Sequence, residues 1–281
     1  MLEISVGCRL SYDVSAPTYC VFKIEAANNE SQGVIRESLS IPPGSCGSDD
    51  SYVEPVTLNR TKRVSLGPGA VEVIYEADVE VDTSGFDPNC VTEFQFRDLP
   101  MDCLEFLAPS RYCPSDTFTQ FAFDTFGQLQ GGHSRVTAIC DWIFSNILYE
   151  QGTTGPFTDA GQVFQARRGV CRDFAHLGIA MARATGVPAR YASVYADRLA
   201  PQDFHAVFEA YLLGPSGGRW FAFDPSRMSS PDAVVRIAAG RDAADVAFAW
   251  PQGEVESAPP EVWVNAKGRS GSAITNLAIS D

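Results

Sequence analysis

Residues 169–186 read GVCRDFAHLGIAMARATG, and this stretch decides how the second half of the chain is organised. Its apolar side chains recur at spacings of three and four, which is typical of one buried face of a helix. Gly186 and Pro188 follow and predict the end of that helix. Cys171 is therefore expected in the first turn. The periodic apolar positions are Phe174, Leu177, Met181 and Ala184.

A cysteine in the first turn of a helix is chemically special. The unpaired N–H groups and the helix dipole favour negative charge there, so the thiol is biased toward the reactive thiolate. Arg167 and Arg168, just upstream, act in the same direction. A cysteine elsewhere on a buried helix is an inert small hydrophobe. The pattern makes Cys171 the candidate nucleophile.

Downstream of this helix the chain reads as strands. The runs ARYASVYA (189–196), FHAVFEAYLL (204–213) and RWFAFDPS (219–226) are rich in β-branched and aromatic residues, and the turn GPSGG joins the last two as a hairpin. His205 lies near the start of the first hairpin strand and Asp224 near the end of the second. An antiparallel hairpin brings those two positions together, so imidazole and carboxylate meet, and a helix N-terminus packed on the sheet presents Cys171 to the other ring nitrogen.

Each of these residues also has a simpler interpretation. A single histidine between apolar neighbours is often a core residue with one backbone hydrogen bond. An aspartate before a proline is often a turn residue. Neither His205 nor Asp224 alone indicates whether its role is structural or catalytic. Only their combination with Cys171 indicates catalysis.

The first part of the chain predicts a different architecture. Residues 1–110 carry alternating and β-branched patterns, interrupted by turn clusters such as Pro42-Pro43-Gly44 and Gly67-Pro68-Gly69, which favours an antiparallel sandwich. The prolines around residues 108–118 predict a boundary between domains 1–110 and 111–281. Residues 115–186 are expected to be mostly helical, including HSRVTAICDWIFSNILYE (133–150). The tail from residue 227 either completes the second sheet or docks on the first domain.

The amino-acid composition limits the classes of binding partner that we expect. The formal net charge of −14 argues against nucleic acid and anionic membranes as partners. The N-terminus shows no basic segment followed by an apolar run, so no signal peptide is expected, and no stretch is long enough to span a bilayer. We expect a soluble, cytoplasmic protein whose eight scattered cysteines are free thiols. No cofactor is expected and no metal site, because the histidines and cysteines lack ligand spacing and no D-x-D-x-D-G loop occurs.

Three segments in fixed order resemble one known family. GVCRDFAHL, FHAVFEAYL and WFAFDPS are similar to the Cys, His and Asp motifs of the transglutaminase-like superfamily, and especially to its bacterial branch of cysteine proteases with a β-rich N-terminal domain. The resemblance covers nearly the whole chain, and the Cys motif is its most specific part. It implies an α+β protein in which an N-terminal β-sandwich precedes a papain-like core, where the helix bearing Cys171 packs on an antiparallel sheet.

The resemblance implies a Cys171–His205–Asp224 triad that acts through a thioester acyl-enzyme. Two enzymatic functions share this intermediate: a hydrolase acting on peptide or protein amides, and a glutamine γ-glutamyltransferase with an amine acceptor. A third alternative is a non-catalytic binding module on the same scaffold. The family often carries a tryptophan directly after the histidine, whereas this chain has Ala206, which bears on specificity. The sequence does not indicate an oligomeric state.

Secondary site residues are predicted around the nucleophile. The backbone N–H of Cys171 is the expected oxyanion donor, and Gln165, six residues upstream, is a second candidate. Arg172 and Asp173 are candidates for substrate contact, although a first-turn aspartate also compensates the helix dipole. His176 is expected to be structural.

Overall fold

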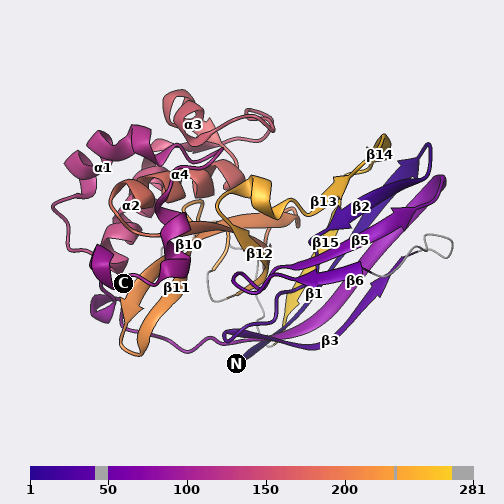
Figure 1. Cartoon of the computed structure of the whole chain (residues 1–281), viewed down its shortest axis with the longest axis horizontal. Helices are drawn as coiled ribbons and strands as arrows, with labels where there is room; N and C mark the ends of the chain where they lie inside the picture. The colour runs from indigo at the N-terminus through magenta and orange to yellow at the C-terminus, as the bar shows by residue number, and fades with distance from the viewer. Residues whose placement is uncertain (42–49, 231–232, 268–281) are drawn as a thin grey trace.

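Figure 1 shows two parts: a β-sandwich whose strands run from indigo to purple, with yellow strands among them, and a helical part on an orange sheet. This computed structural model describes residues 1–41, 50–230 and 233–267. The chain is a mixed α+β protein, which confirms the predicted fold class. The predicted turn Pro42-Pro43-Gly44 lies outside the described residues.

Two antiparallel sheets form the N-terminal sandwich. In one, the long central strands alternate buried and exposed side chains, so one face of each points into the core. The strand orders, ignoring the C-terminal additions, are β1-β6-β3 and β2-β5-β4. Gly69 opens one strand with φ +104°, a left-handed conformation that suits the predicted turn at residues 67–69. The strands are β1 (Leu2–Val14), β2 (Thr18–Phe22), β3 (Gln32–Ser40), β4 (Asp50–Val53), β5 (Arg60–Leu66) and β6 (Gly69–Val81).

The C-terminal strands return to this sandwich. β13 (Ala249–Pro251) pairs with β2, while β14 (Val255–Ser257) and β15 (Glu261–Ala266) both pair with β1. The described tail therefore takes both positions left open for it: β12 (Val234–Gly240) completes the second sheet beside β9 (Ala189–Ala196), and the later strands return to the first domain. As a result β1 has neighbours along both of its edges (Figure 1).

The segment between the sandwich and the helices lies against a separate four-stranded sheet, which belongs to the second part of the chain. Thr92 and Leu213 exchange two backbone hydrogen bonds of 2.9 Å, and the Phe94 ring stacks on Tyr211 at 5.4 Å. The sandwich strands end at Val81, so the chain leaves the sandwich earlier than the predicted boundary after residue 110. The segment contains short 3₁₀ turns: η1 (Pro88–Cys90), η2 (Phe96–Asp98), η3 (Met101–Leu107) and η4 (Ser115–Phe118).

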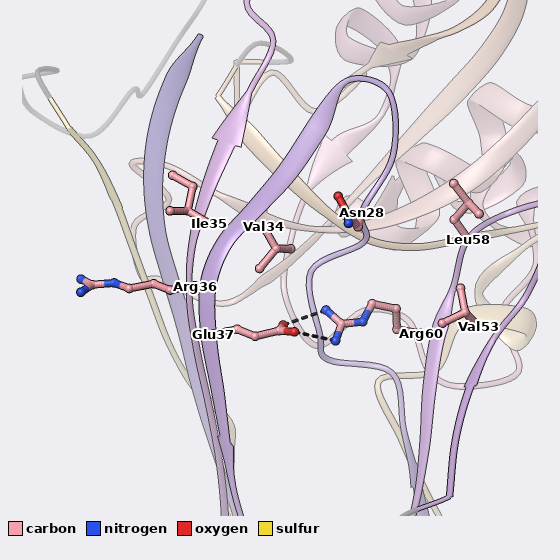
Figure 2. A pocket seen from close by; sticks show the side chains of 8 residues that line it. All are labelled: Asn28, Val34, Ile35, Arg36, Glu37, Val53, Leu58 and Arg60. Carbon is pink, nitrogen blue, oxygen red and sulfur yellow. Dashed lines mark hydrogen bonds and ion pairs between the residues drawn. The ribbon is translucent and has the colours of Figure 1, made fainter.

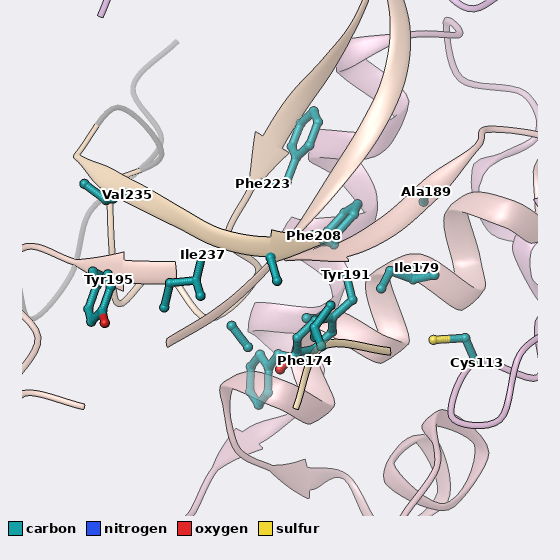
Figure 3. Packing of buried hydrophobic residues seen from close by; sticks show 14 of the residues in the cluster. Cys113, Phe174, Ile179, Ala189, Tyr191, Tyr195, Phe208, Phe223, Val235 and Ile237 are labelled. Atoms are coloured by element: carbon teal, nitrogen blue, oxygen red, sulfur yellow. The ribbon is translucent and has the colours of Figure 1, made fainter. Parts of the chain in front are cut away.

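The second part packs helices on a four-stranded antiparallel sheet of order β11-β10-β9-β12. Gly178 lets a helix approach this sheet closely, because a Cβ there would lie 2.6 Å from a ring carbon of Phe208. Figure 3 shows Phe208 and Tyr191 among the buried side chains between the sheet and this helix. The elements are α1 (Thr119–Phe126), α2 (His133–Asn146), α3 (Ala160–Ala166), α4 (Cys171–Ala184), β9 (Ala189–Ala196), β10 (Phe204–Gly214), β11 (Gly217–Phe223), β12 (Val234–Gly240) and η5 (Ala243–Val246).

One helix is shorter than its sequence pattern predicts. The run 133–150 is helical only to Asn146, and Ile147 is extended, with φ −116° and ψ 126°. Residues 148–149 then form β7 (Leu148–Tyr149), which pairs in parallel with β8 (Arg168–Gly169). Tertiary pairing has overridden helical periodicity here. This pairing ties residues 148–149 to the loop that leads into α4.

The sandwich covers β12, which is the edge strand of the four-stranded sheet in the second part of the chain. The Asn59 amide bonds both backbone groups of Ala239 at 2.7 Å, and the Gln32 amide bonds the N–H and carbonyl of Arg236 at 2.7 and 2.9 Å. Side-chain amides thus replace a missing neighbour strand along β12. An edge strand covered in this way is protected from pairing with another chain.

Candidate active site

Cys171 is the first residue of α4, as the sequence predicts, and its side chain is partly accessible. The approach is fixed by α3, which ends at Arg167 in the left-handed conformation (φ 56°), and by the pairing of β8 with β7. The helix hydrogen bonds start with Asp173 and Phe174, whose N–H groups both donate to the Val170 carbonyl. The Cys171 N–H comes before these bonds and has no partner within the helix.

Asp173 fixes this helix start. Its side chain is fully buried, and its carboxylate accepts hydrogen bonds from the Val170 N–H at 2.9 Å and from the Thr154 hydroxyl at 2.5 Å. The Arg172 guanidinium adds a bond of 2.9 Å and also donates to the Gly155 carbonyl. These contacts give Asp173 a structural role in the loop. Substrate contact by Arg172 and Asp173 stays a prediction, and Arg172, with 27% of its side chain exposed, is the more accessible of the two.

His205 and Asp224 meet as the hairpin predicts. β10 and β11 pair with Phe208 opposite Phe223, so Asp224 follows directly on the strand beside the histidine strand. His205 Nε2 lies 2.8 Å from Asp224 Oδ2, and both side chains are almost completely buried. Hydrogen bonding to a buried carboxylate fixes the orientation of the ring and leaves Nδ1 for another partner.

Asp224 is held by four further donors that the sequence analysis did not identify. Oδ1 accepts from the N–H and hydroxyl of Ser226 at 2.9 and 2.6 Å, and Oδ2 accepts from the N–H and hydroxyl of Ser229 at 2.8 and 2.7 Å. A serine two residues after an aspartate is a signal for such a turn, and it was available for Ser226 in DPS. Ser229 has no comparable local signal.

The thiol of Cys171 contacts the same imidazole. It interacts with the His205 ring, whereas Nδ1 has no hydrogen-bond partner of standard geometry among the described residues. Because Nε2 is engaged by Asp224, the nitrogen that faces the thiol is Nδ1. The three predicted residues therefore lie together in the order thiol, imidazole, carboxylate.

Burial and charge act in opposite directions on this pair. Burial disfavours the charged His205 ring, but the Asp224 carboxylate and the Cys171 thiol outweigh it and raise the pKa of His205 to about 10. Burial likewise disfavours the carboxylate, yet His205 and the two serines hold the pKa of Asp224 below its usual range. The site is thus built to keep a protonated imidazole beside an ionised aspartate.

Gln165 and His176, the other two residues considered in the sequence, have different surroundings. Gln165 is exposed in α3, and its role as an oxyanion donor stays a prediction. His176 is fully buried, accepts a hydrogen bond from the Ala243 N–H at 3.1 Å and stacks on Tyr112. Burial and nearby arginines lower the pKa of His176 well below its usual value, so it is a neutral packing residue, as expected.

The described residues were also compared with the requirements of a metal site and of a membrane-spanning helix. Within the ranges 1–41, 50–230 and 233–267, no cluster of three or more histidine, cysteine or acidic side chains is arranged to hold a metal ion. No helix in those ranges has the length and apolar character to cross a membrane. The seven cysteines that the structure describes are all free thiols, and Cys46 lies outside the described residues.

A cavity of about 500 Å³ lies in the sandwich, away from these residues (Figure 2). It is lined by residues of β3, β4 and β5 and the loops beside them, and its polar centre is the paired Glu37 and Arg60. None of its lining residues belongs to α4 or to the sheet that carries His205. Cavity volume alone therefore does not mark the reactive centre here.

Comparisons with known proteins agree with the geometry. Residues 119–225, which include all three predicted catalytic residues, match the model of the transglutaminase-like superfamily. A crystal structure named as a putative cysteine protease from Cytophaga hutchinsonii is 35% identical, covers 98% of this chain and 94% of its own, and superposes with a TM-score of 0.88.

Two curated relatives match over shorter stretches. An uncharacterized protein of Mycobacterium leprae is 30% identical over 148 residues, which are 51% of this chain and 53% of that protein. An uncharacterized protein of Mycobacterium tuberculosis is 34% identical over 115 residues, 37% of either chain. This chain therefore spans about half or less of the curated relatives that it matches. The matches support a family of cysteine-dependent enzymes.

Proposed function

This chain belongs to the transglutaminase-like superfamily, and from that premise we propose that it is a cysteine-dependent amide hydrolase with peptide or protein substrates. The observation that carries the proposal is the buried bond of 2.8 Å between His205 and Asp224, with the Cys171 thiol against the same ring. This is the arrangement that nucleophilic catalysis by a thiol needs. The name of the Cytophaga hutchinsonii structure favours hydrolysis over amine transfer.

In the proposed reaction, Cys171 Sγ attacks the carbonyl carbon of the amide, and its thiol proton resides on His205 Nδ1. The carbon–nitrogen bond then breaks as the imidazolium gives that proton to the leaving amine, which leaves a thioester on Cys171. Water attacks the thioester, His205 accepts a proton from the water, and the carbon–sulfur bond breaks. Asp224 keeps the ring oriented and stabilises its charged form throughout.

The proposal assigns each residue a separable task. Cys171 forms the covalent bond, His205 moves the proton, and Asp224 acts only through His205. The helix N-terminus at Cys171 adds partial positive charge near the developing negative charge. An amine in place of water would give the γ-glutamyltransferase reaction from the same thioester, so the choice of acceptor needs an experiment.

Mass spectrometry of a peptide library incubated with the protein, with and without a primary amine, tests the proposal. We expect pairs of fragments whose masses sum to the parent peptide plus one water, unaffected by the amine. Cys171→Ala is the control that should give none. Amine adducts on glutamine would support the γ-glutamyltransferase function in place of the hydrolase function. The absence of any Cys171-dependent product would favour the binding-module alternative.

A further inference from the structure

Tyr149 lies beside the nucleophile although the sequence analysis gave it no role. It belongs to β7, where it pairs with Gly169 of β8, two residues before Cys171. The next residue extends this pairing, since the Glu150 N–H donates to the Gly169 carbonyl at 2.9 Å. The tyrosine backbone is therefore tied directly to the loop that presents the thiol.

The ring of Tyr149 is also held in place. Its centroid lies 5.6 Å from that of Phe174, on the first turns of α4, and the two rings are tilted at 52°. Packing against the helix that carries the nucleophile sets the direction of the phenol. The hydroxyl then faces Cys171, where it interacts with both the thiol and the backbone N–H.

A carbonyl that is attacked by Cys171 must place its oxygen near these same groups. Attack by Sγ converts the carbonyl into a tetrahedral species with negative charge on oxygen, and hydrogen-bond donors aimed at that oxygen lower the barrier. The Cys171 N–H is one donor, because it precedes the first hydrogen bonds of α4. A phenolic O–H within reach of both Sγ and this N–H is suitably placed to be the second.

The phenol is chemically suited to donate. Its burial, and then the neighbouring thiol, raise the pKa of Tyr149 well above its usual value. The hydroxyl therefore keeps its proton at neutral pH and can donate a hydrogen bond. Gln165, by contrast, is exposed in α3.

We infer that the Tyr149 hydroxyl and the Cys171 backbone N–H together form the oxyanion site of this protein. The inference rests on the acyl-transfer function proposed above. In the resting protein the hydroxyl faces the Cys171 N–H, and the substrate oxygen takes its place between the two groups. Tyr149 thereby touches the reacting atoms and is a catalytic residue rather than a packing residue.

Tyr149→Phe tests this inference, because it keeps the ring and its packing on Phe174 and removes only the hydroxyl. Two reactions of Cys171 are compared. Turnover of 4-nitrophenyl acetate passes through an oxyanion and should slow by about 10²–10³-fold, the usual effect of losing one such donor. Alkylation by iodoacetamide forms no oxyanion, so its rate should stay close to that of the unmodified protein.

Two further variants sharpen the comparison. Tyr112→Phe is the matched control, because the Tyr112 hydroxyl is occupied by the Pro156 carbonyl at 2.6 Å, and it should leave ester turnover unchanged. Tyr149→His returns an N–H donor and should recover part of the lost turnover without changing alkylation. Circular dichroism confirms that each variant is folded.

Several outcomes would overturn the inference. Ester turnover by Tyr149→Phe equal to that of the unmodified protein is one, and an equal loss of turnover and alkylation is another, since the hydroxyl would then act on the thiol alone. A loss in Gln165→Ala with none in Tyr149→Phe would transfer the role to the glutamine. Failure of the unmodified protein to show Cys171-dependent turnover would instead refute the proposed function, and this inference with it.

Discussion

Two clusters of charged side chains in this molecule look alike, but one is partly exposed and the other is buried. In the sandwich, the Arg60 guanidinium is bonded to Glu37 by two contacts of 2.7 Å, to Glu25 at 2.9 Å and to the Ala26 carbonyl at 3.1 Å. In the sheet β11-β10-β9-β12, His205 has one nitrogen on Asp224 and the other facing a thiol. The first cluster lines a cavity, whereas the second lies beside the Cys171 thiol.

The difference teaches which polar clusters are reactive. An arginine does not lose its proton at ordinary pH, so the sandwich cluster can only bind and hold. A histidine can transfer a proton, and its free nitrogen lies against an atom that can form a covalent bond. A group that titrates and is incompletely paired marks function better here than the volume of the space around it.

The largest expected effect comes from removing the nucleophile. Cys171→Ala and His205→Ala should each lower amide turnover by about 10⁶-fold, because they remove the covalent and proton-transfer steps. Asp224→Asn should retain more activity, with a loss of about 10⁴-fold, since it only orients the base. Steady-state kinetics on one peptide substrate measures all three. An Asn variant that is folded but as inactive as Cys171→Ala contradicts the supporting role.

A second difference is expected in thiol reactivity at pH 6. Burial raises the pKa of Cys8 and Cys20 to about 11 and that of Cys103 to about 12, and Asp87 raises the pKa of the exposed Cys90. Cys171, beside a helix N-terminus and an imidazole, should therefore react with iodoacetamide about 10²-fold faster than an ordinary thiol, which is almost fully protonated at that pH.

Peptide mapping after a pH series of labelling measures this difference. His205→Ala should slow labelling of Cys171 at pH 6 and much less at pH 9, where an accessible thiol ionises by itself. Uniform labelling of the cysteines, or a Cys171 profile that ignores the loss of His205, would argue for the non-catalytic alternative.

The charge pair should also shape stability against pH. The pKa of His205 is raised from 6.5 to about 10, so its stabilisation is fully present below pH 6.5 and is lost as the pH rises toward 10. The pKa of Asp224 is lowered from 3.8, so its stabilisation is present above that pH and is lost as the pH falls below it. Urea unfolding should therefore show a larger fall in the free energy of unfolding between pH 6.5 and 10 than it does for Asp224→Asn. Parallel curves for the two proteins would contradict a coupled pair.

The smallest effect on activity is expected from the sandwich cluster. Glu37→Gln keeps the shape but weakens the bonds to Arg60, and it should lower the free energy of unfolding by about 1–2 kcal/mol, since the pair is only partly exposed. Amide turnover should be unchanged. If the folded Glu37→Gln variant lost turnover, the two clusters would be coupled, and the contrast drawn between them would be wrong.

The candidate site could be predicted largely from sequence because its parts are local. The hairpin of residues 204–226 and the helix start at Cys171 are short-range features with clear patterns, and together they bring the thiol, the imidazole and the carboxylate into proximity. The positions of Ser229 and Tyr149 near these residues could not be predicted from the sequence, because they depend on tertiary contacts. Tyr149 in particular follows a helical pattern that strand pairing with residues 168–169 interrupts.

The arrangement of the two parts could not be predicted in the same way. Asn59 bonds the backbone of Ala239, 180 residues later, and no periodicity or turn signal indicates such a contact. The sequence pattern also gave no sign that Phe86 and Phe106, which precede the predicted boundary near residue 110, pack their rings on Phe221 and Trp220 of β11. Composition changes locate linkers well only when the linker makes few contacts.

The return of β14 and β15 to β1 has a consequence for synthesis on the ribosome. Ile4 pairs with Ala266 and Tyr12 with Ser257, so β1 waits during synthesis for residues that lie far downstream in the chain. Contacts of such long sequence separation form slowly, and meanwhile one edge of β1 is unpaired and prone to association. A fragment ending at residue 110 carries this exposed edge permanently and should aggregate. The nascent chain therefore depends on rapid synthesis of β14 and β15, or on a chaperone, to cover this edge of β1.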